Sequence, residues 1–112
     1  MLQRPASLSL DYVFKGLADA NRRKLLDRLH AEAGQTLSEL CDGMGIARQS
    51  VSKHLAILEA ASLVVSVKRG REKLHYLNPV PIAEIYDRWI GKYERDRTTA
   101  LVRLREDVES DE

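Results

Sequence analysis

Apolar residues recur every three or four positions along most of this chain, which predicts a mainly helical protein. A first helix is expected over residues 8–18 and a second over residues 20–33, each with one apolar stripe. Asp19 is a favourable N-cap for the second helix, because its carboxylate can accept hydrogen bonds from the backbone N–H groups of the first turn. Gly34 marks the expected end of that helix.

Two more helices are predicted in the middle of the chain. Thr36 is followed three residues later by Glu39, the spacing of a capping box, so a third helix should begin there and run over residues 37–44. A fourth helix is expected over residues 48–61, although Ala47 is a poor N-cap and leaves its start the least secure boundary. The stripe of the fourth helix that should face inward consists of Val51, Leu55 and Leu58.

The rest of the chain predicts a hairpin and then a long helix. A short run of β-branched residues and a short alternating run flank the basic sequence KRGREK, so a two-stranded hairpin is expected over residues 63–78. Pro79 and Pro81 should end this ribbon, and a helical stripe then continues over residues 82–108 with Gly91 as its one weak point.

The spacing from Leu37 to Val51 is typical of a helix-turn-helix. With Leu37 as the first position, the fifth is Cys41, where two helices approach closely and only a small side chain fits. The ninth is Gly45, in the turn, and the fifteenth is Val51, which packs back between the helices. We therefore predict a winged helix-turn-helix, mainly α with a small β-hairpin, in which residues 37–61 form the helix-turn-helix and the hairpin forms the wing.

Length and composition are those of a single globular domain over residues 1–112. The chain is 44% hydrophobic and 31% charged, its apolar runs are far too short to span a membrane, and no signal peptide pattern opens it. The single cysteine cannot form an internal disulfide, which agrees with a reducing compartment. We expect a cytoplasmic protein without a membrane partner.

The net charge of +1 conceals an uneven distribution. Residues 1–42 are neutral, residues 43–79 carry six basic against two acidic side chains, and residues 80–112 carry six basic against nine acidic ones. A locally basic segment is the electrostatic feature that a polyanion partner requires. This segment coincides with the predicted helix-turn-helix and wing.

Double-stranded DNA is the partner that this segment favours, because one helix fits the major groove and side chains there can bond to base edges. The residues expected to read an operator are Arg48, Gln49, Ser50, Ser52 and Lys53. Arg69 and Arg71, on either side of Gly70, are expected to touch a minor groove or its phosphates. For Lys68 and Lys73 the sequence leaves open whether they contact the DNA backbone or only water. A solvated polar face without a ligand is the alternative interpretation of the whole segment.

A homodimer is expected, since one recognition helix covers only part of a helical turn of DNA. The last helix has a wider apolar face than a small domain can cover, and the first helix is the natural second element of the interface. The predicted interface residues are Val13, Phe14, Leu17, Ile82, Ile85, Trp89, Tyr93 and Leu101. The alternative is a last helix packed wholly within its own subunit.

Several segments also resemble the ArsR/SmtB family of bacterial winged-helix repressors. They include FKGLADANRRKLLDRL and KYERDRTTALVRL, and the match is strongest in SVSKHLAILEAASLV and GREKLHYLNP. It spans residues 10–105 and is closest to the branch that lacks the metal motifs. The resemblance implies a homodimer that occupies an operator near its own promoter and releases it on a signal.

Metal binding, the property for which this family is known, does not fit the residues present. Thr36 and Ser38 stand where the family has its thiolate pair, and no histidine lies in the last helix. Cys41 is expected to be a packed core residue, with a thiol-oxidation switch as the alternative. His54 should hydrogen-bond at the edge of the recognition helix, and His75 should lie on the ribbon surface.

No catalytic constellation and no cofactor motif can be picked out, so we do not expect an enzyme. The predicted function is that of a metal-independent transcriptional repressor. A ligand-responsive or oxidation-responsive repressor remains open, as does a winged helix used as a protein-interaction module. The operator, the inducing signal and the choice between repression and activation lie outside the sequence.

Overall fold

The computed structural model describes the backbone of residues 6–110 and the side chains of residues 10–108. The chain divides into two compact units, Met1–Pro81 and Ile82–Glu112, which are described separately below. The elements are α1 (Ala6–Leu17), α2 (Ala20–Ala31), α3 (Leu37–Cys41), α4 (Arg48–Ala60), β1 (Val64–Arg69), β2 (Glu72–Leu77), α5 (Val80–Ile85), the π-helical segment η1 (Tyr86–Ile90) and α6 (Gly91–Ser110). The predicted division into one domain with helical extensions stays a prediction.

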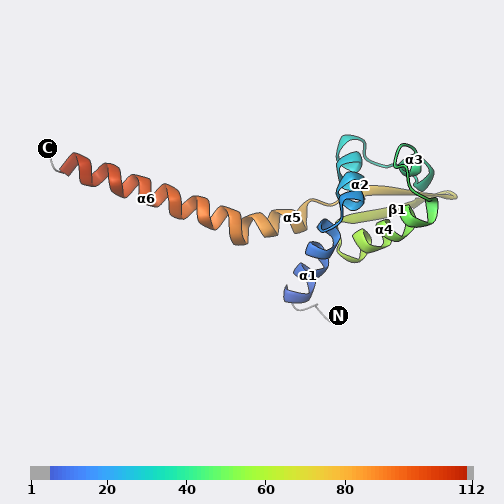
Figure 1. The fold of residues 1–112 in the computed structure, drawn as a ribbon, viewed down its shortest axis with the longest axis horizontal. Helices are drawn as coiled ribbons and strands as arrows, with labels where there is room; N and C mark the ends of the chain where they lie inside the picture. The colour runs from blue at the N-terminus through green and yellow to red at the C-terminus, as the bar shows by residue number, and fades with distance from the viewer. Residues whose placement is uncertain (1–5, 111–112) are drawn as a thin grey trace. The chain divides into compact units, whose positions relative to one another are not determined.

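The first unit is a winged helix-turn-helix, as the sequence predicts. Helix α4 packs against α1, α2 and α3 on its inner side and against the start of the hairpin, so it is central to the fold (Figure 1). The predicted inward stripe of α4 is confirmed, because its three apolar residues are all buried. The largest fully buried side chains are Leu25, Leu29, Leu40, Val51, Leu58 and Leu63.

Two local signals for helix starts are confirmed. The Asp19 carboxylate accepts hydrogen bonds from the backbone N–H groups of Asn21 and Arg22, and caps α2. Thr36 and Glu39 form the reciprocal capping box at the start of α3. As expected for Ala47, no side chain caps α4. The prediction for α3 was too long, because the helix ends at Cys41 and the chain then turns through glycines with positive φ.

The wing is a two-stranded antiparallel sheet whose register runs from Val64 opposite Leu77 to Arg69 opposite Glu72. Gly70 adopts a φ of +65° at its tip, a left-handed conformation that favours glycine. Gln35 extends the ladder through an isolated antiparallel bridge to His75. The hairpin is therefore paired back to the chain segment that leads into α3.

The burial of His75 corrects the prediction that this residue lies on the ribbon surface. Only 3% of His75 is exposed, and its Nδ1 donates a 2.8 Å hydrogen bond to the backbone oxygen of Gln35. The Gln35 side chain is buried beside it and donates to two carbonyl groups at the end of α2. The bridge between these two segments, forty residues apart, brings the imidazole inside the fold.

The second unit is a continuous helical segment formed by most of α5, η1 and α6. The expected long helix is confirmed, but the π-helical turn over Tyr86–Ile90, just before Gly91, was not predicted. The Tyr86 hydroxyl donates a hydrogen bond to the Glu94 carboxylate, which raises the pKa of the phenol. Within residues 6–110, no helix has both the length and the apolar character needed to cross a membrane.

Candidate nucleic-acid interface

Helix α4 presents a polar surface on the side opposite its buried stripe. Of the residues predicted to read DNA, Arg48, Gln49, Ser52 and Lys53 are exposed, whereas Ser50 is half-buried. The arrangement follows from helical periodicity, since burying Val51 turns its sequence neighbours outward. The predicted recognition residues thus lie together on one surface of one helix, and Ser50 is the least accessible of them.

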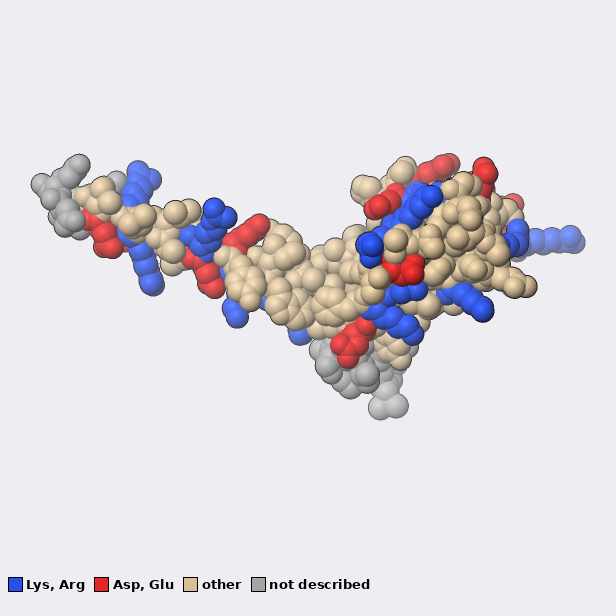
Figure 2. Space-filling model, in the orientation of Figure 1, with Lys and Arg blue, Asp and Glu red and all other residues tan. Residues whose placement is uncertain are grey.

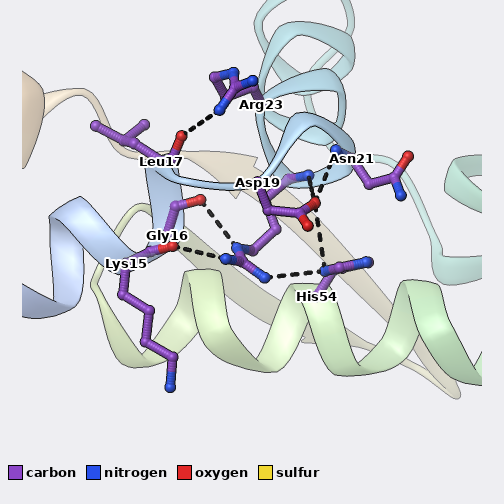
Figure 3. A network of polar contacts seen from close by, with 8 residues as sticks. Lys15, Gly16, Leu17, Asp19, Asn21, Arg23 and His54 are labelled. Atoms are coloured by element: carbon purple, nitrogen blue, oxygen red, sulfur yellow. Dashed lines mark hydrogen bonds and ion pairs between the residues drawn. The ribbon is translucent and has the colours of Figure 1, made fainter.

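A polar network fixes α4 to the junction between α1 and α2 (Figure 3). Arg22 donates through Nη1 to His54 Nδ1 at 3.3 Å, and the Asp19 carboxylate lies 4.0 Å from the same ring nitrogen. A guanidinium can only donate, so Nδ1 of His54 is the acceptor in this contact. The prediction that His54 hydrogen-bonds at the edge of the recognition helix is therefore confirmed. Backbone hydrogen bonds to Asp19, that from Arg22 above all, hold the pKa of this carboxyl below its usual value.

Most of the basic side chains of α2 bond to backbone carbonyls, a role that the sequence analysis missed. Arg22 donates to the carbonyls of Lys15 and Gly16, and Arg23 donates to that of Leu17, which satisfies the open end of α1 (Figure 3). Arg28 does the same at the end of α3, where it reaches the carbonyls of Glu39 and Leu40. The sequence signal for this role was the run of basic residues 22–24, which closely follows the end of the first helix.

The start of α4 and the wing border a shallow groove of about 280 Å³. Three cationic side chains line it, and Arg48 also donates a 3.0 Å hydrogen bond to Ser38 Oγ on α3. Basic side chains project from the hairpin end of this unit (Figure 2). The residues lining the groove are Thr36, Leu37, Ser38, Arg48, Arg71, Glu72 and Lys73.

Lys73, whose contact with DNA stays a prediction, has a partner within the protein. Its Nζ lies 3.1 Å from Oε1 of Glu59, the single acidic residue of α4, and forms an ion pair with it. His75 Nε2 lies 3.8 Å from the same carboxylate oxygen. These contacts join β2 of the wing directly to α4.

The predicted interface residues fall into two groups. On α1, Val13 is buried inside its own unit and Leu17 is half-buried, whereas 44% of Phe14 is exposed. On the second unit, Ile85 is half-buried and the other four are exposed: Ile82, Trp89, Tyr93 and Leu101.

The side chains that could act as metal ligands do not lie together in the part of the chain that the structure describes. Residues 6–110 contain no cluster of three or more His, Cys, Asp and Glu side chains that could hold an ion. Cys41, expected to be packed in the core, is half-buried with a free thiol on α3. The Nδ1 atoms of His54 and His75 are engaged in the contacts described above. This donor set does not fit the tetrahedral thiolate and imidazole site that a zinc-type ion prefers.

Comparison with known proteins agrees with this geometry. A family model described as a helix-turn-helix domain matches residues 17–67. The uncharacterized HTH-type transcriptional regulator YuzN of Bacillus subtilis is 36% identical over 86 residues, which cover 71% of this chain and 94% of YuzN. The transcriptional repressor SdpR of the same organism is 32% identical over 69 residues, which cover 62% of this chain and 76% of SdpR.

A solved structure extends the match to most of the chain. The ArsR-like transcriptional regulator from Rhodococcus sp. RHA1 is 33% identical, with a TM-score of 0.67 over 88% of this chain and 93% of that one. Family and fold are those of DNA-binding transcriptional regulators and not of enzymes. The chain therefore belongs to the ArsR family of winged helix-turn-helix transcriptional regulators.

Proposed function

We propose that this protein is a homodimeric repressor that binds a palindromic DNA operator and does not sense a metal. The exposed polar surface of α4 carries this proposal, because four potential base-reading side chains lie opposite a buried stripe. No acidic side chain lies among them. A duplex is the polyanion whose major groove accepts a helix with such a surface.

Each side chain has a defined role in the proposed complex. Gln49 can bond bidentately to adenine, and Arg48 or Lys53 can bond to guanine, so these residues specify the sequence. Ser52 tolerates either kind of partner, and the half-buried Ser50 contributes least. Arg69 and Arg71 at the wing tip contact phosphates or the minor groove, and position the protein rather than select the site.

The homodimer is supported by the apolar side chains of the second unit. Tyr93 and Leu101 are each more than half exposed, and Trp89 is 40% exposed. A helix with so much exposed apolar surface in a short chain requires a partner, and a second copy would place two recognition helices on half-sites about 34 Å apart. On α1, Phe14 supplies the accessible surface for this interface, whereas Val13 packs within its own subunit.

The repressor role rests on the similarity to SdpR, which is itself named a transcriptional repressor. Independence from metals rests on the scattered donor groups. Cys41 lies on α3 without a second thiol in the chain, so a thiolate pair cannot form within one subunit. Operator release that needs added zinc, or that is reversed by a chelator, would contradict this part of the proposal.

The decisive experiment is titration of the purified protein on its own upstream DNA and on a scrambled duplex, at several salt concentrations. We expect binding to both at low salt, tighter binding to the upstream DNA, and a steep loss of affinity as salt rises. Absence of any binding at low salt would favour a protein-interaction module instead. Release by peroxide that Cys41→Ser abolishes would favour the oxidation-responsive version.

Variants of the helix and the wing test the division of labour. Gln49→Ala or Lys53→Ala should weaken binding to the upstream DNA by about 1–3 kcal/mol and binding to the scrambled duplex much less. Arg69→Ala or Arg71→Ala should weaken both and lower the salt slope by about 1. Lys92→Ala, a cation lost from the second unit, is the matched control. If all four variants lost the same affinity for both duplexes, the helix residues could not be distinguished from the wing residues as the ones that select the sequence.

A further inference from the structure

Glu59 occupies an unexpected place for an acidic residue. It is the single carboxylate on α4, the helix proposed to enter the groove of a polyanion. Its side chain is 30% exposed, and its two oxygens lie 3.1 and 3.4 Å from Nζ of Lys73, whose side chain is 52% exposed. The contact therefore neutralises one cation of the wing at the edge of the candidate DNA surface.

The surroundings of Lys73 show where this cation could otherwise act. Lys73 lines the groove that also holds Arg48 and Arg71. It equally lines an adjoining hollow of about 240 Å³ that includes Ser52, on the outward surface of α4. Its ammonium group thus lies between two parts of the proposed interface, yet it is bound to a carboxylate of its own subunit.

His75 lies beside this ion pair. Side chains two positions apart on a strand share a face, so Lys73 and His75 both face α4. The hydrogen bond from Nδ1 to the Gln35 carbonyl fixes the imidazole, and its Nε2 lies 3.8 Å from Oε1 of Glu59. The carboxylate therefore lies between a buried ring and the lysine, both on β2.

We propose that Glu59 is a specificity-determining residue that withholds Lys73 from DNA phosphates. This inference rests on the proposed DNA binding. A phosphate contact by Lys73 would strengthen binding to every sequence equally, which lowers the ratio of specific to non-specific affinity. Breaking the ion pair to make that contact would also leave the Glu59 carboxylate unpaired near the phosphates. The pair thus removes one sequence-independent contact and leaves the base-reading residues unchanged.

A double-mutant cycle on a scrambled duplex tests the proposal. The quantity measured is the salt slope, the steepness of the fall of log affinity with log salt concentration, to which one phosphate contact contributes about 0.9. In the wild type, Lys73→Gln should change this slope by much less than about 0.9. In a Glu59→Gln background, where Lys73 is released, the same substitution should lower the slope by about 0.9. Glu59→Gln alone should therefore bind the scrambled duplex more tightly at low salt and lose about threefold more affinity between about 50 and 200 mM salt.

Glu72 offers a matched control, because Glu72→Gln removes the same charge from the wing next to Lys73. The released-lysine effect should be absent in this background, so that Lys73→Gln acts there as it does in the wild type. Circular dichroism melts of each variant check that the fold is retained.

Two outcomes would overturn the inference. If Lys73→Gln lowers the slope by about 0.9 in every background, Lys73 already contacts a phosphate with Glu59 present. If it changes the slope in none, Lys73 does not reach DNA at all. Either outcome leaves the proposed function standing, whereas a wild-type protein that binds no duplex at low salt would contradict the proposed function itself.

Discussion

The two units share the same helical apolar periodicity but differ in what covers it. In the first unit Leu25 and Leu58 are fully buried, because short turns bring α1 to α4 and the hairpin onto one another. In the second unit 59% of Leu101 and 60% of Leu104 are exposed. A hydrophobic stripe therefore specifies which face of a helix needs a partner, and the topology decides whether the same unit provides one.

Charged residues differ between the units in the same way. In the first unit the arginines of α2 are bound to backbone carbonyls at the ends of α1 and α3, so much of the positive charge serves packing. Outside α1 and α2, the described cations of this unit lie on α4 and the wing. Along the second unit basic and acidic side chains alternate, as an exposed helix surface requires (Figure 2). The net charge of a segment therefore indicates a candidate interface only when the charged side chains that bond within the protein are left out of the count.

Truncation of the first unit's core should have the largest effect on folding. Leu58→Ala removes a fully buried side chain from the last turn of α4 and should cost about 2–5 kcal/mol of unfolding free energy, through lost burial and the cavity that remains. Urea denaturation followed by circular dichroism measures this cost. Arg97→Ala, at an exposed residue of α6 outside the predicted interface, is the control and should have little effect on unfolding. Equal costs at the two positions would contradict the contrast between the units.

Charges placed on the exposed stripe of the second unit should instead disrupt association. Leu101→Asp with Leu104→Asp should weaken the proposed dimer by about 2 kcal/mol per carboxylate, or about a thousandfold together, because each charge would be buried in an apolar interface. Analytical ultracentrifugation measures the monomer fraction, and operator binding should be lost with the dimer.

Thr99→Asp is the matched control for this double variant, since helical periodicity places residue 99 opposite the two leucines on α6. It should leave association nearly unchanged. A double variant that still sediments as a dimer would show that this part of the stripe is not the interface.

Local signals predicted those parts of the fold whose causes lie within one turn of the chain. The cap at Asp19, the box formed by Thr36 and Glu39, and the buried stripe of α4 each depend on residues two to four positions apart. The outward surface of α4 follows from the same periodicity, so four of the five residues expected to read DNA are exposed as predicted. Their contact with DNA stays a prediction.

The features that were missed depend on pairings between distant segments. His75 belongs to an alternating ribbon and is buried where its backbone pairs with Gln35, forty positions earlier, and its ring faces α4. The ion pair from Lys73 to Glu59 likewise requires the wing to fold back on α4. The π-helical turn at Tyr86–Ile90 has no pattern of its own in a continuous helical stripe. Each of these needs tertiary geometry that one sequence does not supply.

A smaller change tests how tightly α1 packs in the first unit. A methyl group added at Gly16 would meet Cδ1 of Leu63 at 2.9 Å and Cδ2 of Leu58 at 3.4 Å, and both leucines are fully buried. Alanine gains about 1 kcal/mol over glycine in a helix, but overpacking costs about 1–3 kcal/mol, so Gly16→Ala should destabilise by about 1 kcal/mol. Lys15→Ala, at an exposed neighbour, should stay within about 0.5 kcal/mol. A more stable Gly16→Ala variant would show that this contact is looser.

The smallest expected effect concerns the charge of Asp19. Its pKa is lowered in the folded state, chiefly by the backbone N–H of Arg22, so the ionised carboxylate stabilises the fold. That contribution is complete above the ordinary pKa of 3.8 and is lost as the pH falls through the lower folded value. Asp19→Asn keeps a side chain that can cap α2 but removes the charge. Its melting temperature should therefore lie slightly below that of the wild type at neutral pH, and the difference should close in strong acid.

Asp96→Asn, on the exposed surface of α6, should show no such convergence, because no helix start depends on that carboxylate. A deficit for Asp19→Asn that persists unchanged in strong acid would mean that the side chain acts through its shape rather than through its charge.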